Sequence, residues 1–202
     1  MKLGREFYAR DTITVAKELL GNVLVHQVDG VLLKGRIVET EAYLGIEDKA
    51  AHSYGGRRTD RIKVMYGPPG HAYVYLIYGM YYLFNIITAK EGVPEGVLIR
   101  ALEPLENIDK MALNRFKKPY DKLSKYERQN LTNGPGKLTR AFKIDKELYG
   151  IDLCGDRLYV EEGTNKDFNI VETTRIGIDY AEEAKYFPYR FYIENNPYVS
   201  VK

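Results

Sequence analysis

Two long hydrophobic runs, Arg36–Leu44 and Ala72–Ile87, dominate the pattern of apolar and polar positions along the chain. The first run lies in a predicted hairpin, whose strands cover Val23–Val28 and Val31–Tyr43 and whose turn is Asp29-Gly30. An Asp-Gly pair between two apolar segments is a strong short-range signal for a hairpin. Because the second of these strands is apolar at most positions, we expect both of its faces to be covered over part of its length.

The second run predicts a hairpin rich in tyrosine. Its strands are expected over His71–Ile77 and Tyr81–Thr88, with Tyr78-Gly79-Met80 at the tip. An exposed aromatic side chain at such a tip favours insertion into another molecule. Some DNA-binding proteins push side chains of this kind between stacked bases.

The remaining elements are shorter, and the segment between the two runs, residues 45–69, is predicted to be mostly loop. Long loops of this kind are usually functional. We predict helices over Ile13–Leu20, Leu105–Arg115 (beginning after Pro104) and from the glycine-rich stretch at Gly134 to Phe142, and strands over Val97–Leu102 and near Leu158–Val160, Asn169–Glu172 and Arg190–Ile193. The pattern favours one α+β domain spanning residues 1–202, built on a mostly antiparallel sheet with flanking helices.

Composition narrows the class of protein. The 202 residues are 45% hydrophobic and 29% charged, which is typical of a folded globular chain. No apolar run is long enough for a membrane span, and the first residues carry no apolar leader, so we expect an intracellular protein without a membrane. A single cysteine excludes an internal disulfide, and three histidines leave little material for zinc.

The net charge of +2 conceals an asymmetry along the chain. Lys110–Lys146 contains eleven Lys and Arg against three Asp and Glu, a net of +8, whereas Glu147–Lys202 has six against eleven, a net of −5. A basic segment next to an acidic one is typical of a nucleic-acid binder with a one-sided surface. The alternative is a solvated helical face.

Two glutamates, Glu39 and Glu41, share one face of the predicted strand Val31–Tyr43. A carboxylate in a buried strand is costly unless it is paired or takes part in chemistry. Glu39 is a candidate ion-pair partner for Arg36 or Arg100. Glu41 lies where the strand enters the long loop, the usual place for a reacting group, although a structural ion pair is the alternative for it as well.

Other polar residues qualify only in combination. His52 in the loop gains weight if Glu41, Tyr43 and Tyr75 converge on it. A metal site of Glu41, Asp48 and His52 lacks any known ligand spacing, so we expect no metal. The stretch from Gly134 to Lys137 offers free backbone N–H groups and a cation for a phosphate, although glycine and proline before a helix are also common punctuation.

At this point the sequence resembles a known family, the alkyladenine (3-methyladenine) DNA glycosylases of the mammalian type, from about Leu3 to Val201. Five blocks in the same order carry the resemblance: Gly35–Gly45, Ala51–Arg57, Tyr73–Tyr81, Leu98–Pro104 and Gly134–Leu138. The resemblance implies a monomeric enzyme that needs no cofactor and works with the DNA, in the cytoplasm and nucleoid or in the nucleus. Such an enzyme flips alkylated or deaminated purines out of double-stranded DNA and hydrolyses the N-glycosidic bond, leaving an abasic site. No lysine stands out as a Schiff-base nucleophile, so we expect no strand cleavage.

The resemblance also implies roles for individual residues. Glu41 corresponds to the general base, Arg100 to an arginine near the attacking water, and Ile176 to a valine whose backbone carbonyl helps to hold that water. The walls around the flipped base correspond to Tyr43, His52 and Tyr75, and Asn85 to the asparagine that crowds the exocyclic amine of guanine. For DNA, Tyr78 corresponds to the residue that fills the vacated stack and Met65 to a second inserted side chain, and Arg57 and Lys137 lie in matching blocks.

Two other classes of protein remain open at this stage. A non-catalytic nucleic-acid-binding module would use the same basic surface and would bind DNA without releasing a base. A small-molecule glycosidase would need two carboxylates, and Glu39 and Glu41 share a strand face. The basic segment argues against the glycosidase.

Overall fold

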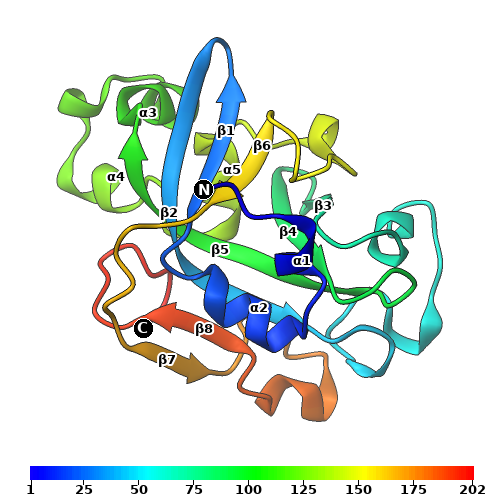
Figure 1. Cartoon of the computed structure of the whole chain (residues 1–202). Coiled ribbons are helices and arrows are strands. Elements are labelled where there is room, and N and C mark those ends of the chain that lie inside the picture. Colours follow the sequence, from blue (N-terminus) through cyan, green and yellow to red (C-terminus); the bar gives the residue numbers. More distant parts are fainter.

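A curled antiparallel sheet forms the centre of the structure, a computed structural model that describes residues 1–202 (Figure 1). The strands follow the order β3-β4-β5-β2-β1-β6, and β8 pairs with both β2 and β7. Their bounds are β1 Val23–Val28, β2 Val31–Tyr43, β3 Ala72–Ile77, β4 Tyr81–Thr88, β5 Glu95–Glu106, β6 Leu158–Glu161, β7 Ile170–Thr173 and β8 Arg190–Ile193. All of the paired strands run antiparallel.

Strand β2 pairs with three other strands of the sheet. Its first half pairs with β1, and its second half lies between β5 and β8, with Glu39–Glu41 opposite Arg190–Tyr192. Side chains near the end of β2 therefore have a neighbouring strand on both sides. The neighbouring strands pair with the backbone of this part of β2, and the side chains of residues 37–42 are all buried, as expected for a run with both faces covered.

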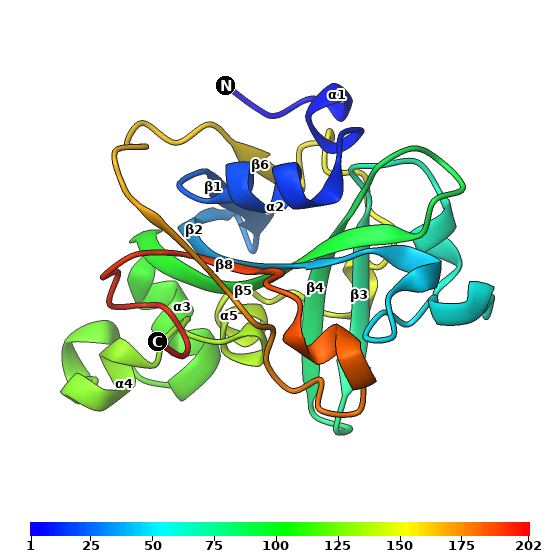
Figure 2. The ribbon, with the colours of Figure 1, turned by 90° about the horizontal axis from the view of Figure 1, so that it is seen from below.

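Five α-helices flank the sheet: α1 Arg5–Tyr8, α2 Thr12–Leu19, α3 Ile108–Phe116, α4 Lys125–Gln129 and α5 Pro135–Ala141. Asp11 caps α2 by accepting a hydrogen bond from the backbone N–H of Thr14 at 2.8 Å. Helix α2 covers one face of the sheet, where the Thr40 hydroxyl of β2 donates to the Ala16 carbonyl at 2.9 Å. The β3–β4 hairpin extends away from this side, and α3, α4 and α5 lie together beyond β5 (Figure 2). None of the helices combines the length and the apolar character that crossing a membrane requires.

The expected α+β class and antiparallel sheet are confirmed, and four strands (β1, β2, β4 and β8) have the predicted bounds. The loop over residues 45–69 contains only short 3-10 turns, at Gly45–Glu47, Tyr54–Gly56 and Lys63–Tyr66. The tyrosine-rich hairpin forms as expected, and its insertion into DNA stays a prediction.

The predicted helix start after Pro104 is wrong. Strand β5 continues through Pro104 to Glu106, and α3 begins only at Ile108, after Asn107 with its left-handed backbone. Pro104 has no N–H to donate, and it lies opposite Gly35 where the β2–β5 pairing shifts register, so the sheet accommodates it at an irregularity. Pro104 therefore lies at an irregularity in the β2–β5 pairing and does not begin a helix.

Candidate active site

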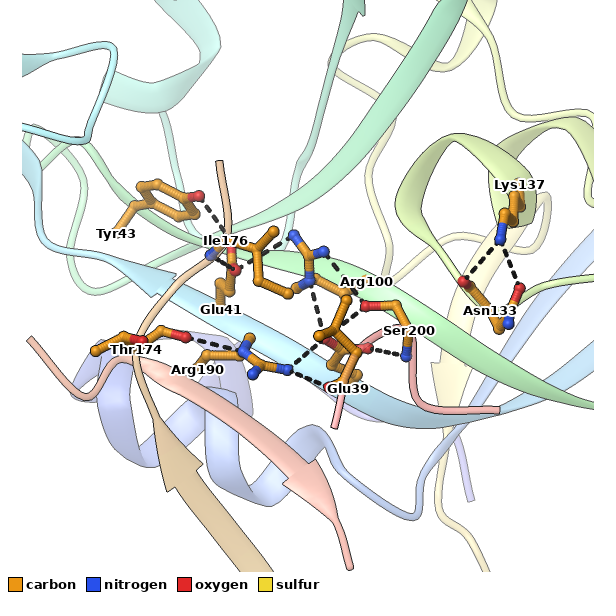
Figure 3. Close-up of polar contacts among 11 residues, drawn as sticks. Glu39, Glu41, Tyr43, Arg100, Asn133, Lys137, Thr174, Ile176, Arg190 and Ser200 are labelled. Carbon is orange, nitrogen blue, oxygen red and sulfur yellow. Dashed lines mark hydrogen bonds and ion pairs between the residues drawn. The ribbon is translucent and has the colours of Figure 1, made fainter. Parts of the chain in front are cut away.

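The Glu41 carboxylate is fully buried, accepts hydrogen bonds from two residues and forms an ion pair with a third (Figure 3). The Tyr43 hydroxyl donates to Oε2 at 2.7 Å, and the backbone N–H of Ile176 donates to Oε1 at 2.8 Å. Arg100 Nη1 forms an ion pair with Oε1 at 3.2 Å. The carboxylate is thereby held in one orientation by donors from three separate parts of the chain.

A β-bulge allows Arg100 to reach this carboxylate. In the β2–β5 pairing, Ala101 lies opposite Glu39 and Ile99 opposite Thr40, so Arg100 is left without a paired residue. Bulges commonly redirect a side chain next to an active site. Here the guanidinium lies between the two buried glutamates, 3.0 Å from Glu39 and 3.2 Å from Glu41.

Beside Glu41 is a cavity of about 290 Å³, close to the lower end of the range for ligand pockets in proteins. Glu41 lies directly behind its wall, because Tyr43, Arg100 and Ile176 line the cavity and each contacts the carboxylate. The rest of the wall is mainly apolar and aromatic and includes Tyr73, Tyr75, Leu83, Asn85, Leu98, His52, Met65 and Tyr180. Such a lining suits a flat ring system.

His52 is held in its neutral form at the pocket wall. Its Nδ1 shares a hydrogen bond of 2.8 Å with the Tyr73 hydroxyl, and its ring meets Tyr75 edge-on at 4.7 Å between centroids. Burial, together with Arg61 and Arg57, lowers the pKa of His52 to about 4. Burial also raises the pKa of Tyr75. A ring that enters the pocket at neutral pH therefore meets uncharged aromatic faces.

Sequence reasoning missed the buried ion pair between Asp48 and Arg175. Arg175 donates to both carboxylate oxygens of Asp48, at 2.5 and 2.8 Å, and its guanidinium lies 4.8 Å from the centre of the Tyr43 ring. This pair joins the loop that carries His52 to the segment that carries Ile176. Asp48, considered above as a metal ligand, is thus committed to Arg175.

Tyr78 is at the tip of the β3–β4 hairpin and is 82% exposed. It and Gly79 both have left-handed backbone, with φ of 53° and 66°, which makes the tight turn. Tyr78 also lines the pocket, so its ring borders the pocket at an exposed position. Met65, expected to be a second inserted side chain, is only 4% exposed and packs with Ile62, Tyr73 and Ile87 in the pocket wall.

Arg57 and Lys137 lie outside the pocket lining. Arg57 is exposed in the loop, whereas the Lys137 ammonium donates to Asn130 Oδ1 at 2.6 Å and Asn133 Oδ1 at 2.9 Å. Burial lowers the pKa of Lys137, and its two partners are uncharged, so its positive charge is not cancelled by them. Gly136 brings α5 against the hairpin, because a Cβ there would lie 2.8 Å from the Tyr81 ring.

The structure therefore brings Tyr43, His52, Tyr75, Asn85, Arg100, Ile176, Met65 and Tyr78 to one pocket, with Glu41 immediately behind it. Besides Asp48 and Arg175, the sequence reading missed Arg190 and Ser200, which contact Glu39 (Figure 3). The only signal in the sequence for any of these four residues was that Arg175 directly precedes Ile176, which the resemblance assigns to the site.

Comparison with known proteins defines the class. The family model described as Methylpurine-DNA glycosylase (MPG) matches residues 6–197. The chain therefore belongs to the methylpurine-DNA glycosylase family, whose members are DNA repair hydrolases that act on damaged bases.

Bacterial proteins match over the whole chain. A protein of Desulfitobacterium hafniense is 61% identical over 201 residues, covering 100% of this chain and 99% of its own. A protein of Clostridium acetobutylicum is 62% identical over 201 residues (100% and 98%), and one of Clostridium tetani is 59% identical over 203 residues (100% of both). Each carries the name "Putative 3-methyladenine DNA glycosylase". The 3-methyladenine DNA glycosylase family that the sequence resembles is thus confirmed, whereas the mammalian type stays a prediction, since these relatives are bacterial.

Proposed function

We propose that the protein excises alkylated or deaminated purines, of the 3-methyladenine type, from double-stranded DNA. It flips the damaged nucleotide into the pocket and hydrolyses the N-glycosidic bond with a water activated by Glu41, leaving an abasic site. The observation that carries the proposal is the buried Glu41 carboxylate, which two hydrogen bonds and an ion pair orient behind an aromatic pocket large enough for one base. The residue roles follow those of the mammalian-type enzymes that the sequence resembles, and no cofactor takes part.

The chemistry needs little more than a well-placed carboxylate. A purine alkylated at N3 or N7 carries a positive charge and is already a good leaving group. Its bond to the sugar breaks through an oxocarbenium-like state, as in glycoside hydrolysis. The negative Glu41 stabilises that state and accepts a proton from the attacking water. Arg100 and the backbone of Ile176 hold the carboxylate and the water in place.

The pocket favours a cationic ring. Tyr43, His52 and Tyr75 form the walls around the flipped base, and the two tyrosine faces favour a cation by about 0.5–2 kcal/mol each. Because His52 is neutral, it does not repel the charged base. Asn85, whose Nδ2 donates to the Tyr73 carbonyl at 3.2 Å, is held where it would crowd the exocyclic amine of guanine.

The DNA contacts follow from the surface around the pocket. Tyr78 fills the gap left by the flipped nucleotide, and Arg57 and Lys137 contact phosphates on either side. We assign Met65 to the pocket wall, because its side chain is buried there. The enzyme acts as a single domain and as a monomer, together with the DNA inside the cell.

Incubation of the protein with methylated duplex DNA tests the function directly. We expect free alkylated purine, detected by chromatography, and abasic sites that become strand breaks only after alkali. Tight binding of the DNA without any released base would instead support the non-catalytic module. Strand breaks before alkali treatment would contradict a glycosylase without lyase activity.

Replacing Tyr78 with alanine should weaken base flipping while leaving the fold intact. Its side chain is 82% exposed, so Tyr78→Ala removes almost no packing. The flipped state should become less populated, because nothing then holds the stack open. Thermal melting of the protein and the fluorescence of a base analogue at the lesion give the two readouts.

Tyr78→Phe is the matched control, since it keeps the ring and should flip the base as the unmodified protein does. A large drop in the melting temperature of Tyr78→Ala would identify a packing role instead. Flipping at full extent without the ring would also contradict the proposed wedge.

A further inference from the structure

We propose that Glu39, Arg190 and Ser200 form a positioning cluster that aims Arg100 at Glu41. The inference rests on the proposed role of Glu41 and adds three residues to it. None of the three lines the pocket, so they act through Arg100 rather than on the substrate. Figure 3 shows Glu39 and Ser200 on the side of Arg100 that faces away from Tyr43, whereas Arg190 reaches Glu39 from below Glu41.

The three nitrogens of Arg100 each have a separate acceptor. Nε donates to Glu39 Oε1 at 3.0 Å, Nη2 donates to Ser200 Oγ at 3.3 Å, and Nη1 faces Glu41 Oε1 at 3.2 Å. The guanidinium is planar and rigid, so fixing two of its nitrogens determines where the third one points. Glu39 and Ser200 therefore set the direction of the contact with Glu41.

Glu39 is committed to this cluster. It is fully buried and accepts from Arg100, from Arg190 Nη1 at 3.1 Å, and from the backbone N–H and the hydroxyl of Ser200 at 2.7 and 2.9 Å. Three of these donors converge on Oε1, and the Ser200 N–H donates to Oε2, so both oxygens of the carboxylate are engaged. Glu39 is therefore a structural anchor and not a second reacting carboxylate, which separates this site from that of a two-carboxylate glycosidase.

Arg190 balances the charge of the cluster. Glu39 and Glu41 carry two negative charges, and without the ion pair between Arg190 and Glu39 the single positive charge of Arg100 would have to balance both. Buried charges are stable only when they are paired and hydrogen-bonded. Arg190 also donates to the Thr174 carbonyl at 2.9 Å, two residues before Ile176, so the same side chain anchors the segment that brings the Ile176 N–H to Glu41.

Ser200 supplies a hydroxyl that neither neighbour can replace. A carboxylate only accepts hydrogen bonds and a guanidinium only donates them. The Ser200 hydroxyl must therefore donate to Glu39 and accept from Arg100. Buried Val199 beside it and the Val201 carbonyl, which accepts from Arg190 at 2.9 Å, hold this part of the chain over β2.

The test compares single-turnover base release from methylated duplex DNA. Ser200→Ala should lower the rate constant about tenfold, the effect of one hydrogen bond between charged neighbours, with the reaction amplitude and the DNA affinity unchanged. Ser200→Thr keeps the hydroxyl and should restore the rate. Thr40→Val is the matched control. It removes the buried hydrogen bond of the Thr40 hydroxyl, which lies on the face of β2 opposite to Glu39 and Glu41, and it should lower only the melting temperature.

A double variant separates positioning from general damage. If Ser200 acts through Arg100 on Glu41, adding Ser200→Ala to Glu41→Gln should not slow the residual reaction further. The cluster would be overturned if the double variant lost rate by the product of the two single effects, or if Ser200→Ala left the rate unchanged. It would also be overturned if Ser200→Thr did not restore the rate, or if Thr40→Val slowed the reaction as much as Ser200→Ala does. An unmodified protein that releases no base would overturn the proposed function instead.

Discussion

Glu41→Gln should lower the rate of base release by a factor of about 10²–10⁴, the usual range for the loss of a general base. Glutamine keeps the shape of the side chain but removes the negative charge that stabilises the sugar cation and accepts the proton. Its amide oxygen can still accept from one or two of the donors Tyr43, Ile176 and Arg100, so the pocket should keep its form. Binding to damaged DNA should therefore survive, and single-turnover release measured beside a binding titration separates the two effects.

Glu41→Gln also removes one partner of the buried Arg100 charge. Because the loss of one member of a buried ion pair costs up to a few kcal/mol of stability, a control is necessary. The melting temperature and the amplitude of the single turnover report that loss independently of the rate. Glu103→Gln removes a half-buried carboxylate that pairs with Arg36 elsewhere on the same sheet, at 3.3 Å, and should leave the rate unchanged. If Glu41→Gln releases base at the rate of the unmodified protein, Glu41 is not the base.

The affinity for duplex DNA should fall steeply as salt rises, with a log–log slope of about −0.9 for each phosphate neutralised. Six to ten such contacts would lower the affinity by about 10³–10⁵ between 50 and 200 mM salt. Lys137 is the residue most directly tied to this effect, since its ammonium is oriented by two neutral asparagines and keeps its charge for a phosphate. Fluorescence anisotropy of a labelled duplex at several salt concentrations gives the slope.

Two lysine variants make this test specific. Lys137→Gln should reduce the slope by about one contact, 0.9. Lys110→Gln is its matched control, because Lys110 already faces Asp29 at 3.1 Å and so has less charge to offer to DNA. A flat salt dependence, or the same loss in both variants, would remove Lys137 from the DNA contacts.

Local signals were enough for much of the fold. The Asp29-Gly30 turn, the apolar run of β2 and the tyrosine-rich hairpin are each determined by neighbours in the sequence, and their strands form as predicted. Pro104 misled because whether proline begins a helix or lies at a bulge depends on the strand opposite to it. The net charge of +8 over Lys110–Lys146 also overstates the free positive charge of that surface, since Asp29 from a distant turn contacts both Lys110 and Lys143.

The site residues also divide into those that the sequence predicts and those that depend on contacts between distant segments. Glu41 was identifiable as a carboxylate at the end of a buried strand, and the resemblance supplied the residues around the pocket. The register shift that frees Arg100 and the contacts of Glu39 with Arg190 and Ser200, 151 and 161 residues away, arise only when distant segments pack together. A local reading of the sequence contains no signal for them.

The pairing of β2 with β8 has a consequence for the order in which contacts form during synthesis of the chain. The strand that carries Glu41 is synthesised early, whereas Arg190 of β8 and Ser200 follow Glu39 by 151 and 161 residues and are synthesised much later. Domains fold as their residues emerge, and contacts of large sequence separation form late. The tyrosine-rich hairpin and the basic segment are therefore synthesised before Arg190 and Ser200, and the contacts that hold Glu39 are among the last that the growing chain can form.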